Sequence, residues 1–534
     1  MQLYPTSNAV YVAAVGIAVV GVGLASTEPA VLAWGGAILV GLAIARAVTL
    51  LGVARVRQAG FEMLWRDTGR SRRIARGQIL ELGAEVRNRD TRAARYVALR
   101  AIASPDLTVE ITPSSGEVPG GGRLAVTVTV SAARVGRHGI FGLSLEVRGS
   151  PGLFEIPLTF ANPFGIEVMP AAHGVALRTA RGGRSRARAE AGRPGPFSGD
   201  GYELRELREH RAGDALKRIA WKASARRGKL LVKDHEREER DVVWLVVDAS
   251  VELWAGEPGR APLDHAIDEA AAVAEAHRQR GDHVGLVVCG ARVLARIAPS
   301  HGPAHASHLM EALANATSTL DVDRSGLDPG DVALRVLEHL KPLDPVLSAN
   351  VSAEDRDELA RRALSAASRA PFAPLAVHGA DGSDRVLRGY LSSFGIASPA
   401  RLEPDRPRTD EMLAETLAKL PLERPRPSLV YVWSPAPDPA KRKVVAEALA
   451  RHSRRRMEVR WVRPHLDDAL PRTQIGVEGA VSYAVSLRAQ ASEKLGERAL
   501  RRLGVTVDRV RTLVVQRPTS VEAEPAPVET PHES

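Results

Sequence analysis

The chain has 534 residues, enough for three or more domains, and its apolar fraction of 44% permits sizeable cores. A formal net charge of +10 favours anionic partners in general, lipid surfaces included. Its single cysteine, Cys289, excludes an internal disulfide bond and any zinc site built from several cysteines.

Two apolar stretches, uncharged except for Arg46 in the second, predict a transmembrane helical hairpin within residues 1–54, with helices at about 8–25 and 30–51. Each stretch is long enough to cross a hydrocarbon layer of roughly 30 Å. A secretory signal peptide is the alternative, but it needs a basic stretch first, and Arg46 is the first basic residue. An excess of arginine follows the second helix and marks the cytoplasmic side: Arg55, Arg57, Arg66, Arg70, Arg72, Arg73 and Arg76. The pattern predicts a two-pass protein of the bacterial inner (cytoplasmic) membrane, with its soluble domains in the cytoplasm.

Short alternating segments predict a β-rich domain over residues 60–170. The clearest are Ile79–Asn88, Tyr96–Ala103, Leu124–Val130 and Ile140–Gly149, separated by Gly, Pro and Ser clusters. Several short strands over about ninety residues are typical of an immunoglobulin-like β-sandwich. We interpret this domain as a spacer.

Residues 171–200 are poor in apolar side chains and rich in arginine, which predicts an exposed basic linker. The arginines are Arg178, Arg181, Arg184, Arg186, Arg188 and Arg193. Nucleic-acid binding is one interpretation of this segment. The interleaved aromatic residues that stack on bases are absent, so no nucleic acid is expected as a partner. The tail at 517–534 is rich in Pro and Glu and is expected to be disordered.

The stretch GDALKRIAWKASARRGKL, from Gly213 to Leu230, predicts one capped helix of about thirteen residues. Asp214 is the expected N-cap and Gly228 the expected residue after the helix end. Arg218, Lys222 and Arg226 form a basic stripe, opposite an apolar stripe that contains Ile219. Two interpretations stay open: internal pairing with nearby glutamates, or a partner-binding face. Trp221 is expected to anchor the core.

Alternating strands and helices over residues 241–516 predict an α/β domain with a doubly wound sheet. Strands are expected at 241–250, 283–290, 291–298, 428–433 and 457–462, with helices at 263–280, 308–316 and 441–455. A helical insertion is expected at about 321–427. Ligands bind such sheets at the carboxyl ends of strands, where Asp248 and Ser250 stand. Their oxygens would suit Mg²⁺.

The segment 201–240 together with the strand ending in Asp-x-Ser closely resembles the domain of unknown function 58 family. The pattern runs from an LRxY-type strand through Gly-Asp, Arg-x-Ile-x-Trp and Ser-Ala-Arg to that strand. The matching residues are Leu207, Arg208, Gly213, Asp214, Arg218, Ile219, Trp221, Ser224, Ala225 and Arg226. His210 departs from the usual Tyr. The phrase NPFGIEV at Asn162–Val168 is similar to the DPFGL element of the family.

This resemblance implies two membrane helices, a β-rich segment and a domain similar to von Willebrand factor type A. It also implies association with a MoxR-type AAA ATPase that helps client complexes assemble, and it brings no established activity. The type A domain carries a metal site, whose positions here are Asp248, Ser250, Glu252, Ser307 and Asp438. Glu252 replaces a serine of that site, and Asp438 follows the third strand late, so a degenerate site is expected, with Mg²⁺ as its candidate ion.

We therefore predict a non-enzymatic membrane-anchored adaptor that binds a MoxR-type ATPase and client proteins. The chain has no GxxxxGK[ST] loop, HExxH or GxSxG motif. A metal-dependent binding or hydrolytic protein that uses Asp248 and Ser250 is the alternative, and nucleic-acid binding through the basic linker is a second one. The histidines at 301, 305 and 308 have helical spacing, but solvated histidines are the preferred interpretation.

Overall fold

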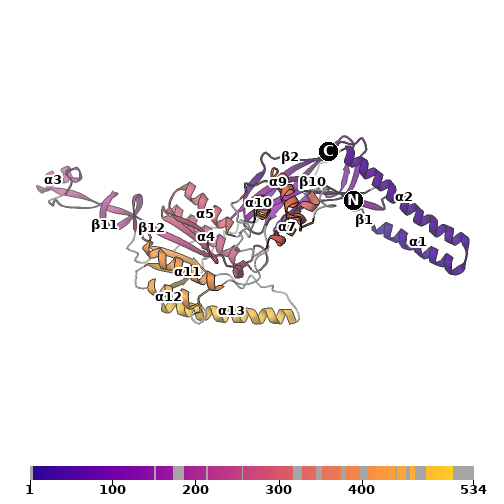
Figure 1. The fold of residues 1–534 in the computed structure, drawn as a ribbon. Helices are drawn as coiled ribbons and strands as arrows, with labels where there is room; N and C mark the ends of the chain where they lie inside the picture. The colour runs from indigo at the N-terminus through magenta and orange to yellow at the C-terminus, as the bar shows by residue number, and fades with distance from the viewer. Residues whose placement is uncertain are drawn as a thin grey trace, which may run out of the picture. The chain divides into compact units, whose positions relative to one another are not determined.

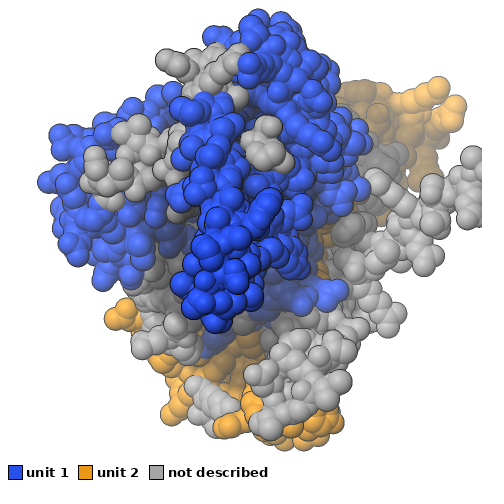
Figure 2. All heavy atoms as spheres, turned by 90° about the vertical axis from the view of Figure 1, so that its right-hand side faces the viewer, with its two compact units in different colours: residues 1–170, 249–264, 311–405 blue, residues 171–248, 265–310, 406–534 orange. Residues whose placement is uncertain are grey.

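A computed structural model describes residues 4–59, 61–148, 152–171, 186–211, 214–254, 256–316, 328–343, 352–374, 381–396, 406–438, 442–452, 457–463 and 477–508. The chain divides into two compact units, coloured separately in Figure 2. Unit 1 contains residues 1–170, 249–264 and 311–405, and unit 2 contains residues 171–248, 265–310 and 406–534.

Unit 1 begins with an antiparallel helical hairpin, made of α1 (Ser7–Ser26) and α2 (Pro29–Ala59) (Figure 1). Both helices are long and apolar enough to cross a membrane, over Ser7–Ser26 and Pro29–Gly52. The short strand β1 (Tyr4–Pro5) precedes α1 and pairs with β10 (Phe154–Met169). Thr6, the N-cap of α1, donates its N–H to the carbonyl of Leu153 over 3.0 Å. Both ends of the hairpin are therefore joined to the same unit.

Glycines let the two helices of the hairpin approach closely. A Cβ atom at Gly23 would lie 2.7 Å from the backbone nitrogen of Leu32, and one at Gly35 would lie 2.7 Å from that of Val20. Because lipid tails are as apolar as the helices, close packing of this kind holds helices together in a membrane.

Two sheets follow in unit 1. One contains β1, β3 (Ser71–Ala75), β5 (Ala94–Ala103), β7 (Gly116–Val118), β9 (Gly136–Arg148) and β10. The other has the order β2 (Phe61–Trp65), β4 (Ile79–Asn88), β8 (Arg123–Ala132) and β6 (Leu107–Thr112). Alternate side chains of both sheets, such as Val86, Val128, Leu143 and Ile156, share one core.

The four strands predicted over residues 79–149 are confirmed as β4, β5, β8 and β9. The segment predicted as a helical insertion at 321–427 divides between the units. It supplies α7 (Pro329–Leu343), α9 (Arg356–Ala367) and α10 (Gly382–Phe394) to unit 1, and α11 (Arg406–Lys419) to unit 2. The three helices of unit 1 share a core that includes Phe141 of β9.

Unit 2 contains a mostly parallel sheet with the order β14-β13-β12-β15-β16-β17. Its strands are β12 (Leu231–Asp248), β13 (His283–Cys289), β14 (Val293–Ser300), β15 (Leu429–Trp433), β16 (Glu458–Val462) and β17 (Thr506–Asp508). All pairs between neighbours are parallel except β13–β14. The continuous apolar runs of β12 and β15 fit strands that are buried on both faces.

Helices cover both faces of this sheet. Tyr431 and Trp433 of β15 contact His277 and Glu269 of α4 (Pro262–Gln279). The alternate residues Val430 and Val432 pack instead in a core with α11, α12 (Lys443–His452) and α13 (Val477–Arg502). The helix α5 (Pro303–Asn315) follows β14. Since β13 and β15 flank β12 on opposite sides, the carboxyl end of β12 is the point at which the strand order reverses.

A long two-stranded ribbon extends from this sheet, formed by β11 (Arg186–Glu209) and the first part of β12 (Figure 1). Residues 186–200, predicted as part of a basic linker, lie in β11, because they pair with the β12 segment that ends at Asp241. Residues 172–185 of the predicted linker and the predicted tail at 517–534 lie outside the described residues.

Candidate functional site

Asp248 is the last residue of β12, and its buried carboxylate is held by two side chains from other elements. Its Oδ2 accepts hydrogen bonds from Ser434 Oγ over 2.7 Å and from Arg406 Nη1 over 2.9 Å. Ser434 directly follows β15, and Arg406 is the first residue of α11. The contacts therefore gather at the strand-order reversal, where the sequence predicts a ligand site.

A second ion pair completes this network. Arg442 Nη2 lies 2.7 Å from Asp410 Oδ1 and donates to Ser434 Oγ over 3.1 Å. It also lies 4.0 Å from Asp248 Oδ2, and Arg406 Nη1 lies 3.6 Å from Asp410 Oδ1. Two carboxylates and two guanidiniums thus balance in charge, in a site where Asp248, Asp410 and Arg442 are buried. We call these four residues and Ser434 the Asp248 network.

The network keeps Asp248 ionised. Burial alone would raise the pKa of Asp248, but the positive charges of Arg406 and Arg442 and the Ser434 hydrogen bond together lower it below its ordinary value. Burial, and next the negative charge of Asp248, raise the pKa of the neighbouring Cys289 thiol. A neutral buried thiol is a poor nucleophile, so nothing here indicates cysteine chemistry.

The other predicted metal ligands lie outside β12. Ser307 is exposed on α5, where its hydroxyl donates to the Pro303 carbonyl over 3.1 Å. Asp438 is half-buried beyond β15, and its backbone carbonyl accepts the N–H of Arg442. Ser250 and Glu252 belong to unit 1, whereas Asp248 belongs to unit 2.

This donor set does not fit a divalent cation. One of the two Asp248 oxygens, Oδ2, already accepts two hydrogen bonds, and two guanidiniums supply the compensating positive charge. Across the described part of the chain, no three His, Cys, Asp or Glu side chains are grouped to hold a metal ion. Among the three spaced histidines, His305 Nε2 is 2.6 Å from the Val284 carbonyl, His301 packs on His283, and His308 is exposed.

The second candidate site is the end of the β11–β12 ribbon, which carries the family pattern. Here η1 (Leu216–Arg218) and α3 (Trp221–Arg227) replace the single helix predicted after Asp214. The break lies at Ile219 and Ala220, because Ile219 forms a β-bridge to Val232 and Ala220 donates its N–H to the Leu231 carbonyl. Pairing with β12 therefore overrides the local helix preference.

One group of pattern residues fixes this ribbon end from within. Arg208 donates to both carboxylate oxygens of Asp214, over 2.8 and 2.6 Å, and the Arg211 N–H donates to Asp214 over 2.7 Å. These contacts, with the Arg208 hydrogen bond as the largest cause, hold the pKa of Asp214 well below its usual range. Asp214 was predicted as a helix N-cap, but it joins η1 to β11 instead.

Ser224 and Gly228 close the other side of the ribbon end. The hydroxyl of buried Ser224 accepts the Leu231 N–H over 2.8 Å, which ties α3 to the start of β12. Gly228 follows α3 with φ of +66°, so the predicted role of this glycine is confirmed. Gly213 lies outside the described residues.

A second group of pattern residues faces outward. Trp221 is 64% exposed and Leu216 is 71% exposed, so the prediction that Trp221 anchors the core is wrong. Lys222 and Arg226 are exposed on the same short helix. The helix has only two turns, and its buried side chain is Ser224, so it has no room to bury an indole ring. Large apolar side chains surrounded by charge mark interaction sites on soluble surfaces.

The ribbon end has an excess of positive charge. Lys229 pairs with Glu209 over 2.9 Å, and Arg208 pairs with Asp214. Within the described residues, Lys222 and Arg226 form no ion pair. Four of the glutamates expected to pair with them, at positions 203, 236, 238 and 239, have side chains outside the described set. The exposed Trp221 and Leu216 with the cations Arg218, Lys222 and Arg226 form what we call the ribbon-end surface.

Arg406, Arg442 and Asp410 were missed by sequence reasoning. Ser434 directly follows the strand predicted at 428–433, but the third position of the site was assigned to Asp438 instead. Arg406 stands 158 residues from Asp248, in a segment predicted as an insertion, so no local pattern joins them. The available signal was the acid Asp248 at the end of one strand together with the hydroxyl of Ser434 at the end of another.

We compared the chain with curated proteins and with solved structures, and neither comparison gives a similarity high enough to indicate a function. No curated protein matches the chain. The PapD-like domain 7 of human CEP192 aligns at 16% identity and a TM-score of 0.17, covering 21% of this chain and 85% of that domain. The MSP-domain protein SSP-19 of Caenorhabditis elegans aligns at 14% and 0.14, covering 18% and 94%. The secreted serine protease VesC of Vibrio cholerae aligns at 11% and 0.16, covering 22% and 25%. Similarities this low carry no inference about this chain.

The comparison with family models gives a match to the segment that contains the ribbon end. It starts within β11 and continues through the Asp248 network's strand to the region after α7. Residues 206–353 match the family described as "Protein of unknown function DUF58", which supports the resemblance found in the sequence.

Proposed function

We propose that this protein is a non-enzymatic adaptor that is anchored in the bacterial inner membrane and docks a partner protein on the ribbon-end surface. The observation that carries the proposal is the exposed Trp221 beside Lys222 and Arg226, two exposed cations that form no ion pair in the described residues. Tryptophan and arginine are the side chains that contribute most to protein interfaces. A partner with an acidic rim around an apolar pocket would complement them.

The internal contacts of the ribbon end support this role. Arg208, Asp214 and Ser224 fix the backbone, so the outward side chains are presented on a preorganised surface. By the family resemblance, the partner is a MoxR-type AAA ATPase, which supplies the nucleotide chemistry and acts on client complexes. The same resemblance favours an immunoglobulin-like spacer in unit 1 and a type A-like domain in unit 2.

The hairpin supports membrane anchoring. Because both of its ends join unit 1, a hairpin that spans the membrane leaves β1 and the sheets on one side. The arginines that follow α2 favour the cytoplasm as that side. The metal-dependent alternative has less support, since Arg406 and Arg442 take up the Asp248 carboxylate.

The test is photo-crosslinking in native membranes from a reactive amino acid placed at position 221, with captured proteins identified by mass spectrometry. We then measure affinity for the captured ATPase with Trp221→Ala and with Arg218, Lys222 and Arg226 changed to Glu. A buried hot-spot tryptophan is worth about 2 kcal/mol or more, so Trp221→Ala should weaken binding roughly 30-fold. The charge reversal should abolish binding at low salt.

The matched control reverses three exposed cations elsewhere: Arg361, Lys443 and Arg501, whose side chains are 76%, 79% and 69% exposed. This variant has the same net charge as the ribbon-end variant and should bind normally. Equal binding by all variants would reject the ribbon end as the docking surface. Recovery of no ATPase from the crosslinked membranes would reject the partner.

A further inference from the structure

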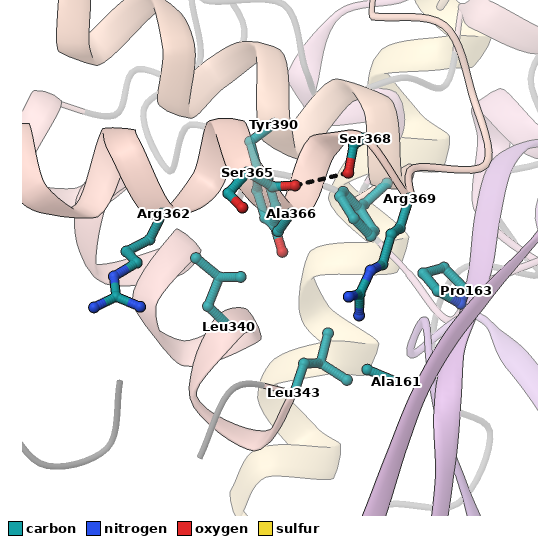
Figure 3. A pocket seen from close by; sticks show the side chains of 11 residues that line it. Ala161, Pro163, Leu340, Leu343, Arg362, Ser365, Ala366, Ser368, Arg369 and Tyr390 are labelled. Carbon is teal, nitrogen blue, oxygen red and sulfur yellow. Dashed lines mark hydrogen bonds between the residues drawn. The ribbon is translucent and has the colours of Figure 1, made fainter. Parts of the chain in front are cut away.

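Unit 1 contains a cavity that has no part in the proposed function. It has a volume of about 390 Å³, within the range of small-molecule sites. Its walls come from three helices and one strand (Figure 3). Leu340 and Leu343 belong to α7, Tyr390 and Phe394 to α10, and Ala161 and Pro163 to β10, while Arg362, Ser365, Ala366, Ser368 and Arg369 belong to α9 and the turn after it.

The charged groups in the wall of this cavity are both cations. Arg362 and Arg369 line it, and among the described residues no Asp or Glu does. Arg362 and Arg361 both contact the Glu358 carboxylate. The guanidinium of Arg369 makes no hydrogen bond or ion pair with the part of the chain that is described. In Figure 3 it extends toward Leu343 and Pro163.

Further donors stand at the same edge. Arg70 Nη1 donates to the backbone carbonyl of Ser368 over 3.1 Å, which adds a third guanidinium near the cavity. The hydroxyl of Ser368 donates to the Ser365 carbonyl over 2.8 Å, which fixes the turn that carries Arg369. An anion at this edge would meet guanidiniums whose planar donors suit phosphate and carboxylate oxygens.

The opposite wall is apolar and rigid. Tyr390 and Phe394 pack with ring centroids 4.5 Å apart, and the Tyr390 hydroxyl contacts His339 Nδ1 over 2.8 Å. Burial lowers the pKa of His339 to about 3, so the imidazole stays neutral and adds no charge to this wall. Leu340 and Leu343 complete it, and a short alkyl chain there would be removed from water.

We propose that this cavity binds an amphipathic anion, with its phosphate or carboxylate head at Arg369 and Arg362 and its apolar chain against Leu340, Leu343 and Phe394. The arginine edge would bind only the anionic head of such a ligand, and the apolar wall would bind only its alkyl chain. A membrane lipid and a soluble phosphorylated or carboxylated metabolite share this chemistry.

The test is isothermal titration calorimetry on the full chain in non-ionic detergent, with blank micelles subtracted. The probes are hexyl phosphate, hexanoate, inorganic phosphate and hexanol, and mixed micelles with and without phosphatidylglycerol serve as competitors. Hexyl phosphate and hexanoate should bind, and each should bind at least tenfold more tightly than phosphate or hexanol. Arg369→Ala should weaken hexyl phosphate at least tenfold, and Leu343→Ala should bring its affinity close to that of phosphate.

Arg361→Ala is the matched control, because Arg361 lies on the same helix and shares Glu358 but does not line the cavity. It should change the affinity less than twofold. Competition by micelles that contain phosphatidylglycerol, and not by micelles without it, would identify a lipid as the source, whereas no competition by phosphatidylglycerol would identify a soluble metabolite. Equal binding of phosphate and hexyl phosphate, no binding of any probe, or equal effects of Arg361→Ala and Arg369→Ala would overturn the proposal.

Discussion

The substitution Asp248→Asn tests whether the Asp248 carboxylate is an ion-pair partner of the two arginines or a metal ligand. The change keeps the size of the side chain and removes its charge. It leaves Arg406 and Arg442 with Asp410 as their only carboxylate in the Asp248 network. Removing one partner of a buried ion pair costs about 3–5 kcal/mol, because the remaining charge loses its compensation. For a unit of this size, we expect the melting temperature to fall by roughly 6–20 °C.

The assay is thermal unfolding of the full chain in detergent, monitored through the fluorescence of the tryptophans buried in unit 2. Asp241→Asn is the control, since it removes a carboxylate from the same strand, where Asp241 is not fully buried. It should cost less than about 0.5 kcal/mol. A double-mutant cycle with Arg406→Gln should show coupling of about 1 kcal/mol or more between Asp248 and Arg406.

Divalent ions supply the decisive comparison. If the guanidiniums take up Asp248, then Mg²⁺ or EDTA should shift the wild-type melting temperature by less than about 1 °C. A ligand present at a hundred times its Kd stabilises a folded protein by about 2.7 kcal/mol. A clear stabilisation by Mg²⁺ that Asp248→Asn abolishes would refute the reasoning and restore the metal site.

Three further predictions concern unit 1. Gly35→Ala should lower the thermal stability of the hairpin in detergent, because the new methyl group meets the facing backbone, whereas Gly36→Ala meets nothing within 4 Å and should be neutral. In intact cells, a cysteine at Thr27 should react with a membrane-impermeant thiol reagent and one at Tyr4 should not; the reverse pattern would overturn the proposed orientation. Because burial lowers the pKa of His339 to about 3, its stabilising contribution is complete above the unfolded pKa of about 6.5 and is lost as pH falls below it. Acidification from pH 7 to pH 5 should therefore cost about 2 kcal/mol through this group, a loss absent in His339→Gln when denaturant titrations are compared at the two pH values.

Local patterns predicted the elements whose form depends on near neighbours. The uninterrupted apolar runs that became α1 and α2 are long enough for membrane-spanning helices, and the alternating segments that became β4 and β8 have the period of a strand with one buried face. Two elements were not predicted correctly, because their conformation depends on pairing with another segment. Residues 186–200 belong to β11 because they pair with β12. The helix predicted after Asp214 is interrupted because Ile219 forms a bridge to Val232.

The Asp248 network was not predicted from the sequence, for a different reason. The sequence indicates where a carboxylate will lie at a strand end, but the sign and source of its counter-charge depend on the chain that folds over that end. Here the first residue of α11 and a residue just before α12 deliver guanidiniums to it. The same strand end with a water-filled approach would be a cation site, so the acid alone does not distinguish the two.

The ribbon end shows how one family pattern can contain two kinds of residue. Arg208, Asp214 and Ser224 are satisfied within the fold, and their replacement would act through the backbone. Trp221 and Arg226 have no comparable internal role, since Trp221 is 64% exposed and Arg226 has no ion pair in the described residues. An exposed indole contributes little to the stability of an isolated fold, because it leaves its apolar surface in water. Its burial by a partner would recover that free energy. Substitutions in the outward group should therefore weaken partner binding and leave the stability of the fold almost unchanged.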